Sequence, residues 1–251
     1  MKKKSQYLIA ICLLTSVLAG IISCNKNSEA TGAPDAGKGG SLARFTISMN
    51  HLYVVDNREL YTFSISNPQN PVKVNTNEVG FDVETIYTWN DKLFIGSRDA
   101  MYVYSIADPG QPQLLGTASH VRACDPVVAN DSIAFVTVRS GSNCGGDINA
   151  LYVYNLKNIM QPVQMKVINL QNPHGLGIKD STLFVCDAGY GLKIYDIHEP
   201  YQPIQLRNIT GEAFYDCIPD GNLLICMIEG GMAIYDIADR NNITLKAKIT
   251  E

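Results

Sequence analysis

Short apolar runs recur along the chain, and each is bounded by Asn, Asp, Gly or Ser. Their apolar residues do not alternate with polar ones, which is typical of strands buried on both faces inside stacked sheets. No segment longer than about ten residues repeats its apolar positions at helical spacing. The pattern therefore predicts an all-β chain. The runs are LYVVD (52–56), LFIGS (93–97), IAFVTV (133–138), TLFVCD (182–187) and LLICMI (223–228).

A second pattern, built around an aromatic residue, repeats after each apolar run. Its clearest versions are AMYVYSIADPGQP (100–112), ALYVYNLKNIMQP (150–162), GLKIYDIHEPYQP (191–203) and GMAIYDIADRNNI (231–243). The aromatic anchors are Phe63, Tyr104, Tyr154, Tyr195 and Tyr235, at intervals of 41, 50, 41 and 40 residues. The long interval contains the Gly- and Ser-rich insertion RSGSNCGGDIN (139–149). We therefore expect five copies of a unit with a period close to forty residues.

Each copy divides into four strand-like pieces. The fourth copy shows them as GLGIK (175–179), TLFVCD, GLKIYDI (191–197) and PIQLRNI (203–209), with a Pro-rich turn, EPYQP (199–203), before the last. Proline fixes its own φ angle and lacks an N–H donor, so such turns end one strand and start an edge strand. Repeated four-stranded units of this length predict a β-propeller, here with five four-stranded blades over residues 42–251. The last copy ends with its own outer strand, LKAKIT (245–250), so no strand remains to complete the first copy by exchange.

The N-terminus carries the pattern of an export signal. MKKK precedes the apolar run YLIAICLLTSVLAGII (7–22), which is shorter than a usual membrane-spanning helix. The residues before Cys24, Ile21-Ile22-Ser23, resemble the lipobox of bacterial lipoproteins, which implies a signal peptide over 1–23 and a lipid on Cys24. An ordinary signal peptide with a chance cysteine and an uncleaved anchor are the alternatives. Asn25 is not the aspartate associated with inner-membrane retention, so we expect delivery to the outer membrane, facing the periplasm or the cell surface.

Residues 24–41 are rich in Gly, Ala, Ser and small charged residues, without a large apolar side chain. Such a segment buries too little surface to order itself, so it predicts a flexible tether. The signal holds three of the 20 basic residues, which leaves 17 against 24 acidic ones in the mature chain. This net negative charge opposes binding to nucleic acids and to anionic lipid surfaces, so the expected membrane contact is the lipid anchor alone.

The motifs LYVVD and IYDI and the paired-proline turn resemble those of the LVIVD-repeat proteins, which are exported bacterial β-propellers. Four further stretches resemble typical motifs of that family: GKGGSLARF (37–45), ACDPVV (123–128), NPHGLGI (172–178) and LFVCDAGYGLKIYD (183–196). The fifth copy departs from it, because ADRNNI lacks both prolines. The resemblance implies a propeller fold and an exported location, but no established reaction.

Five cysteines remain after Cys12 in the signal and Cys24 at the lipid site are set aside. Cys124 opens the inner strand of the third copy and Cys144 lies in the insertion at the same end of that sheet, so we expect a disulfide between them. Two free thiols or a metal site are the alternatives. Cys186 and Cys226 stand at equivalent places in LFVC and LLIC, which predicts that they lie well apart. Both of them, and Cys217, are expected to be buried apolar residues, and no cysteine spacing predicts a metal or other cofactor.

Polar residues stand where the innermost strands begin, and they form a candidate binding rim. Strands that start at one mouth of a propeller bring such side chains together, so they are expected either to bind a cation or a sugar, or to hydrogen-bond with backbone and water. The rim comprises Glu84, His120, Arg122, Asp125, His174 and Asp216.

No nucleophile motif, nucleotide-binding loop or metal triad occurs in the sequence. We therefore expect a non-catalytic binding or scaffolding module whose partner is an envelope protein or a glycan. A propeller glycoside hydrolase or lyase is the alternative, in which Glu84, Asp125 and Asp216 would share the acid, base and positioning roles. A structural spacer without a specific ligand is a third hypothesis.

Overall fold

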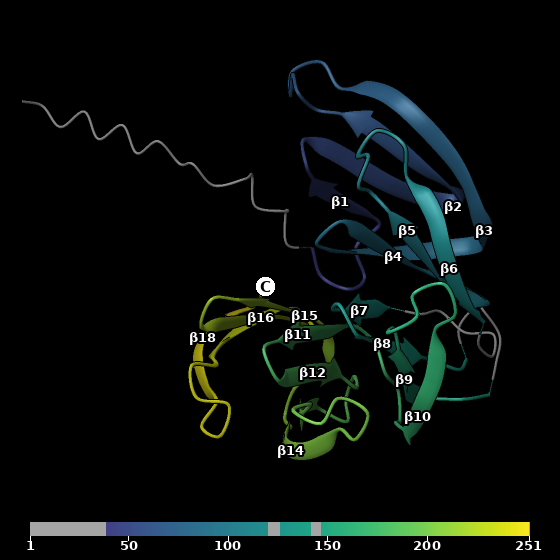
Figure 1. Cartoon of the computed structure of the whole chain (residues 1–251). Helices are drawn as coiled ribbons and strands as arrows, with labels where there is room; N and C mark the ends of the chain where they lie inside the picture. The colour runs from purple at the N-terminus through teal and green to yellow at the C-terminus, as the bar shows by residue number, and fades with distance from the viewer. Residues whose placement is uncertain (1–38, 120–125, 142–146, 251) are drawn as a thin grey trace, which may run out of the picture. The chain divides into compact units, whose positions relative to one another are not determined.

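The computed structural model describes residues 39–119, 126–141 and 147–250, which form eighteen β-strands (Figure 1). All of them belong to one unit, residues 34–251. The strands make one six-stranded sheet, β1 to β6, and three four-stranded sheets, all with antiparallel pairing between chain neighbours. The strands are β1 (Phe45–Ser48), β2 (His51–Ser64), β3 (Val72–Trp89), β4 (Lys92–Ser97), β5 (Ala100–Ser105), β6 (Gln113–Ser119), β7 (Val127–Ala129), β8 (Ile133–Val138), β9 (Ala150–Asn155), β10 (Val163–Asn169), β11 (Leu176–Lys179), β12 (Thr182–Cys186), β13 (Leu192–Asp196), β14 (Ile204–Ile209), β15 (Phe214–Asp220), β16 (Leu223–Ile228), β17 (Gly231–Asp236) and β18 (Thr244–Thr250).

The long strand β3 serves two parts of the six-stranded sheet. It pairs with β2 mainly through residues 72–78, and with β4 through residues 83–89. Asp82, with a left-handed φ of 50°, lies between these halves. The second half of β3 and the strands β4, β5 and β6 thus form a four-stranded blade, as do the other three sheets.

These four blades follow the second to fifth sequence copies, and we number them 2 to 5 accordingly. They confirm the predicted all-β propeller fold. The strand β18 pairs with β17 and belongs to the sheet of blade 5.

Tight turns join the first and second strands of the blades. Asn90 in blade 2 and Asp180 in blade 4 adopt left-handed φ angles of 50° and 51°, and Gly221 does so in blade 5 with 54°. Asn, Asp and Gly are the residues that tolerate this conformation, which explains the polar boundaries of the apolar runs. In blade 3, the Asn130 side chain accepts hydrogen bonds from the amides of Ser132 and Ile133 instead.

The core lies between successive blades, which explains why the second strands are apolar on both faces. In blade 4, Leu183 packs in a cluster with residues of blade 3, whereas Phe184 packs in a cluster with residues of blade 5. Each fully buried side chain of this size contributes about 1.5–3 kcal/mol to stability. Packing between blades is therefore the main stabilising interaction of the fold.

The four tyrosine anchors face the copy that precedes their own. Tyr154 lies in the cluster that contains Phe94 of blade 2, and Tyr235 lies in the cluster that contains Phe184 of blade 4. The four tyrosine anchors are only 2–6% exposed. The repeat of forty residues is thus the repeat of one packing contact.

The three described cysteines correct one expectation. Cys186, Cys217 and Cys226 lie in a single core cluster between blades 4 and 5, at most 1% exposed, so the prediction that Cys186 and Cys226 are well apart was wrong. The reason is an offset of one residue. The anchor tyrosines pair with Leu183 and Leu224, so Cys226 corresponds to Val185 rather than to Cys186. A shift by one residue places a side chain on the opposite face of a strand.

The predicted burial of these cysteines is confirmed, and all three are free thiols. Burial raises the pKa of the Cys186 and Cys226 thiols, and the hydrogen bond with Cys186, together with burial, raises that of Cys217. Because thiolates are the reactive form, these residues act as small apolar core residues.

Candidate functional site at the inner ends of the blades

Three residues of the predicted rim lie in the described part of the chain: Glu84, His174 and Asp216. The other rim residues, His120, Arg122 and Asp125, lie outside the described residues, as do the expected disulfide partners Cys124 and Cys144 and the expected lipidation site Cys24.

Asp216, on the inner strand β15, faces the N-terminal segment of the chain. Its carboxylate, in a residue only 8% exposed, accepts hydrogen bonds from the Ser41 hydroxyl at 3.1 Å and from the Cys217 amide at 2.9 Å. The Ser41 hydroxyl oxygen also accepts a hydrogen bond from the Leu176 amide of β11 at 2.7 Å. Ser41 itself is 1% exposed. The end of the expected tether therefore packs against the inner strands of blades 4 and 5, through what we call the Ser41–Asp216 contact.

Two glycines make room for this carboxylate. A Cβ atom added at Gly40 or at Gly175 would lie 2.0 Å from one of the Asp216 carboxylate oxygens. Any larger residue would force the carboxylate away from Ser41. The glycines of GKGGSLARF and of NPHGLGI thus serve one contact, although they are far apart in the sequence.

Burial raises the pKa of Asp216 to about 6, against an ordinary value of 3.8. Hydrogen bonds from the Cys217 amide, the Ser41 hydroxyl and the backbone of Leu42 and Ser41 oppose this shift without cancelling it. A carboxyl group removed from water is costly to ionise unless its hydrogen bonds compensate in full.

Glu84 lies at the start of the second half of β3 among three arginines. Burial raises its pKa, and the positive charges of Arg44, Arg139 and Arg98 oppose the shift. Arg44 donates a hydrogen bond from Nε to the Glu84 carbonyl at 3.3 Å. Arg98 forms an ion pair with Asp82 at 2.9 Å.

His174 precedes β11 and contacts residues from two neighbouring blades. Its Nε2 lies 3.2 Å from Nη1 of Arg139, and its ring meets Tyr215 edge-on at 5.1 Å between centroids. Burial and the Arg139 charge lower its pKa to about 4. His174 is therefore neutral at physiological pH, and its Nε2 accepts a hydrogen bond from Arg139.

Asp187 holds the segment that leads into His174. This carboxylate is fully buried, accepts hydrogen bonds from the amides of Gln171 and Asn172, and pairs with Lys193. Its role is to position the backbone before the inner strand of blade 4. Residues 170–175 lie between β10 and β11 and outside both strands, and Asp187 accepts hydrogen bonds from two of their amides. This explains why a charged group follows the apolar run TLFVC.

Arg139 connects the two described rim residues that remain available to solvent. It hydrogen-bonds with His174 and acts electrostatically on Glu84. Sequence reasoning predicted Glu84 and His174 but missed the arginines and Tyr215. The sequence held one indication of these residues: Arg44 and Tyr215 stand next to the first residues of the inner strands β1 and β15. We call the combined surface the inner-end patch: Arg44, Glu84, Arg98, Arg139, His174 and Tyr215.

The described residues contain no group of three or more His, Cys, Asp or Glu side chains that could hold a metal ion. Nor does a helix long and apolar enough to cross a membrane occur among them.

Alanine at Gly40 or Gly175 should weaken the fold. Because the added Cβ overlaps the Asp216 carboxylate, we expect each variant to lose about 1–3 kcal/mol of unfolding free energy. Gly189→Ala is the matched control, since its Cβ would meet nothing within 4 Å, and it should change stability by less than about 0.5 kcal/mol. Denaturant titration measures all three, and equal losses in variants and control would contradict the packing described here.

Asp216 should also give stability a specific pH dependence. Its folded pKa lies above its unfolded pKa, so its contribution to unfolding free energy is fully present below about pH 4 and lost as pH rises through about 6. The difference amounts to about 3 kcal/mol. We expect Asp216→Asn, which stays uncharged, to remove this change of unfolding free energy with pH in denaturant titrations between pH 4 and 7.5. Asp147→Asn, at an exposed position, should keep it. A slope unchanged by Asp216→Asn would refute the assignment.

Comparisons with known proteins support the fold alone. No protein-family model matches the chain, and no curated protein matches it. Among solved structures, a functionally unknown protein from Desulfotomaculum acetoxidans DSM 771 aligns with a TM-score of 0.69 and 9% identity, over 86% of this chain and 69% of that one. A protein from Lactobacillus plantarum aligns with a TM-score of 0.62 and 16% identity, over 80% of this chain and 68% of that one. The computationally designed protein Ika8 aligns with a TM-score of 0.60 and 13% identity, over 82% of this chain but only 60% of the Ika8 chain. The chain is thus a β-propeller whose structural neighbours include bacterial propellers.

Proposed function

We propose that this protein is a non-catalytic binding or scaffolding module of the cell envelope, exported and anchored by a lipid on Cys24. Its partner is an envelope protein or a glycan, and the inner-end patch is its recognition surface. The outer membrane is the proposed site of anchoring. Propellers often serve as binding modules, and loops and strand ends on a rigid scaffold are where binding usually resides.

The hydrogen bond between Arg139 and His174 is the observation that carries this proposal. It holds a neutral imidazole beside a cation, with Tyr215 against the imidazole ring. Glu84 adds an acceptor among the arginines. Guanidinium, imidazole and phenol groups at one place suit the hydroxyl and carboxylate groups of glycans or of protein side chains.

The alternative, a glycoside hydrolase or lyase, has weaker support. It needs Asp216 as one of three carboxylates around a substrate. In the Ser41–Asp216 contact that carboxylate is buried and is occupied by donors of the chain itself. Its raised pKa reflects this burial, as expected of a structural group, and we therefore favour binding.

Two finer features of the fold belong to the same proposal. The first copy forms a fifth four-stranded blade from β1, two arms of β2 and the first half of β3. Asn57, at φ 52°, would separate the arms. The Ile65 amide donates to the Asn50 carbonyl, and the same bond joins the second and third strands in blades 2 to 5. Membership of the LVIVD-repeat family likewise rests on the motifs in the sequence.

Photo-crosslinking in cells tests the recognition surface. We expect a photoreactive residue at the exposed position 44 to capture a defined envelope protein or glycan, and Arg139→Ala with His174→Ala to reduce the yield about tenfold, as loss of about 1.4 kcal/mol of binding implies. The same probe at the exposed position 246 on β18 is the control and should capture a different set or nothing. Equal capture with and without the two substitutions would overturn the proposal.

A further inference from the structure

Each sheet has two faces, one on the side of the preceding copy in the chain and one on the side of the following copy. On the face toward the preceding copy, the second strand of each blade contributes two residues. The first pairs with the aromatic anchor, and the other stands two positions later in the strand. In blades 2 to 5 these positions are at most 1% exposed. They are Leu93 and Ile95, Ala134 and Val136, Leu183 and Val185, and Leu224 and Cys226.

The same face of the first copy lies uncovered. Its equivalent residues Leu52, Val54 and Phe63 are all partly exposed. On β1, Phe45 stands opposite Val54 and Ile47 opposite Leu52, with 58% and 37% exposed. These five side chains are all apolar. We call Phe45, Ile47, Leu52, Val54 and Phe63 the leading face.

The opposite end of the series is also uncovered. On blade 5, Met227 pairs with Met232, and Met232 pairs with Ile249, at exposures of 55%, 42% and 60%. The equivalents of the two methionines in blade 4, Cys186 and Leu192, are completely buried because blade 5 covers them.

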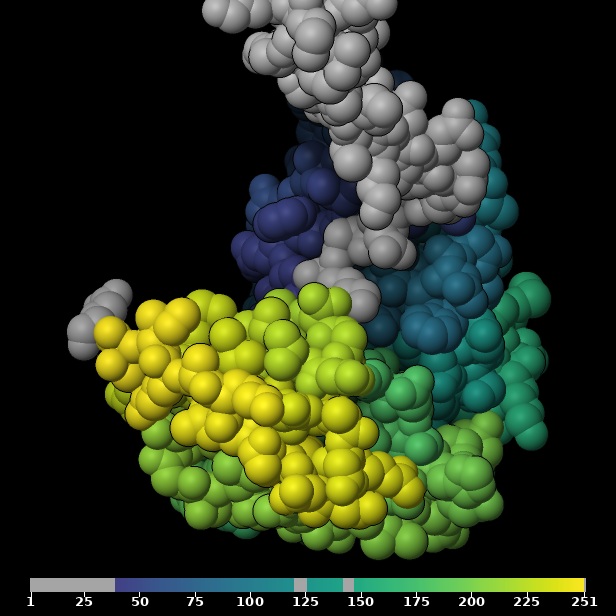
Figure 2. Space-filling model, turned by 90° about the vertical axis from the view of Figure 1, so that its left-hand side faces the viewer, coloured from purple at the N-terminus to yellow at the C-terminus, as the bar shows by residue number. Residues whose placement is uncertain are grey.

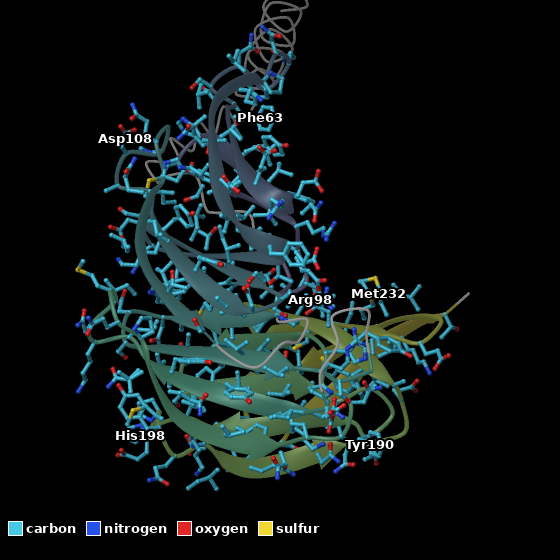
Figure 3. All side chains as sticks on the ribbon, turned by 90° about the vertical axis from the view of Figure 1, so that its right-hand side faces the viewer. Phe63, Arg98, Asp108, Tyr190, His198 and Met232 are labelled. Carbon is cyan, nitrogen blue, oxygen red and sulfur yellow. The ribbon has the colours of Figure 1, made fainter. Side chains whose placement is uncertain are left out.

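We call Met227, Met232 and Ile249 the trailing face. Figure 2 shows the atoms of the C-terminal blade 5, in yellow, on the lower part of the surface turned to the viewer. Figure 3 labels one residue from each uncovered face, Phe63 and Met232.

We propose that the leading face of one molecule packs on the trailing face of a second copy, head to tail. The contact would repeat the packing that joins each blade to the next within the chain, so the two faces are complementary by construction. Both are exposed while the Ser41–Asp216 contact is formed, so they are not covered by one another in this arrangement. A second copy carries both faces and needs no other partner. Such a heterologous contact builds a closed ring or an open chain of molecules.

Sedimentation of the full chain in density-matched detergent tests this proposal. We expect the mass to rise with concentration above that of the monomer. Phe45→Lys on the leading face and Met232→Lys on the trailing face should each weaken self-association about tenfold or more, because each would bury a charge against an apolar sheet. Met160→Lys, at a turn position 69% exposed and away from both faces, is the control and should associate like the wild type.

Mixing the two variants gives the sharpest outcome. Each keeps one intact face, so an equimolar mixture should form dimers and stop there, although neither variant associates alone. Thermal midpoints close to that of the wild type would show that both variants are folded. A wild-type chain that stays monomeric at every concentration overturns the proposal and indicates that the chain covers its own faces. Strong association of Phe45→Lys alone overturns it in favour of two trailing faces packing together.

Discussion

The Ser41–Asp216 contact is the interaction on which the arrangement of the inner strands depends. One hydroxyl group joins the N-terminal segment to β15 through Asp216 and to β11 through the Leu176 amide. Because the carboxylate is buried, its hydrogen bonds are costly to lose, and the two glycines that flank it leave no room for any other side chain there. A contact between residues 175 positions apart in the chain thus ties the start of the domain to its last blade.

The second organising constraint is the packing of one sheet face on the next. The aromatic anchors of the second to fifth copies are buried by the copy before them, whereas Phe63, the anchor of the first copy, is partly exposed. The exposed apolar residues at the two ends follow from this repetition, because an open series of units with two apolar faces leaves one face uncovered at each end. The proposed self-association and the stability of the domain therefore have a common physical basis.

The sequence predicted the repeat, the buried second strands and the propeller fold, because these depend on local patterns of apolar and turn-forming residues. It failed where one residue of register decides the outcome: LFVC and LLIC look equivalent, but their cysteines lie on opposite faces of their strands. It also missed Ser41, which sits in a segment of low complexity, and Arg139, whose partners Glu84 and His174 belong to other blades. Contacts between distant strands leave no periodic signal. The predicted rim is thus divided, with Glu84 and His174 in the inner-end patch and Asp216 in the Ser41–Asp216 contact.

The most direct test of this account is hydrogen exchange of the Leu176 amide in the wild type and in Ser41→Ala. The Leu176 amide donates to the Ser41 hydroxyl, whereas the Gly175 amide donates to the Tyr215 carbonyl and serves as the internal control. We expect Ser41→Ala to speed exchange at Leu176 about tenfold or more, the effect of losing a buried hydrogen bond of about 1.4 kcal/mol, and to leave Gly175 much less affected. Unchanged protection of Leu176 would contradict the claim that Ser41 holds the inner strands together.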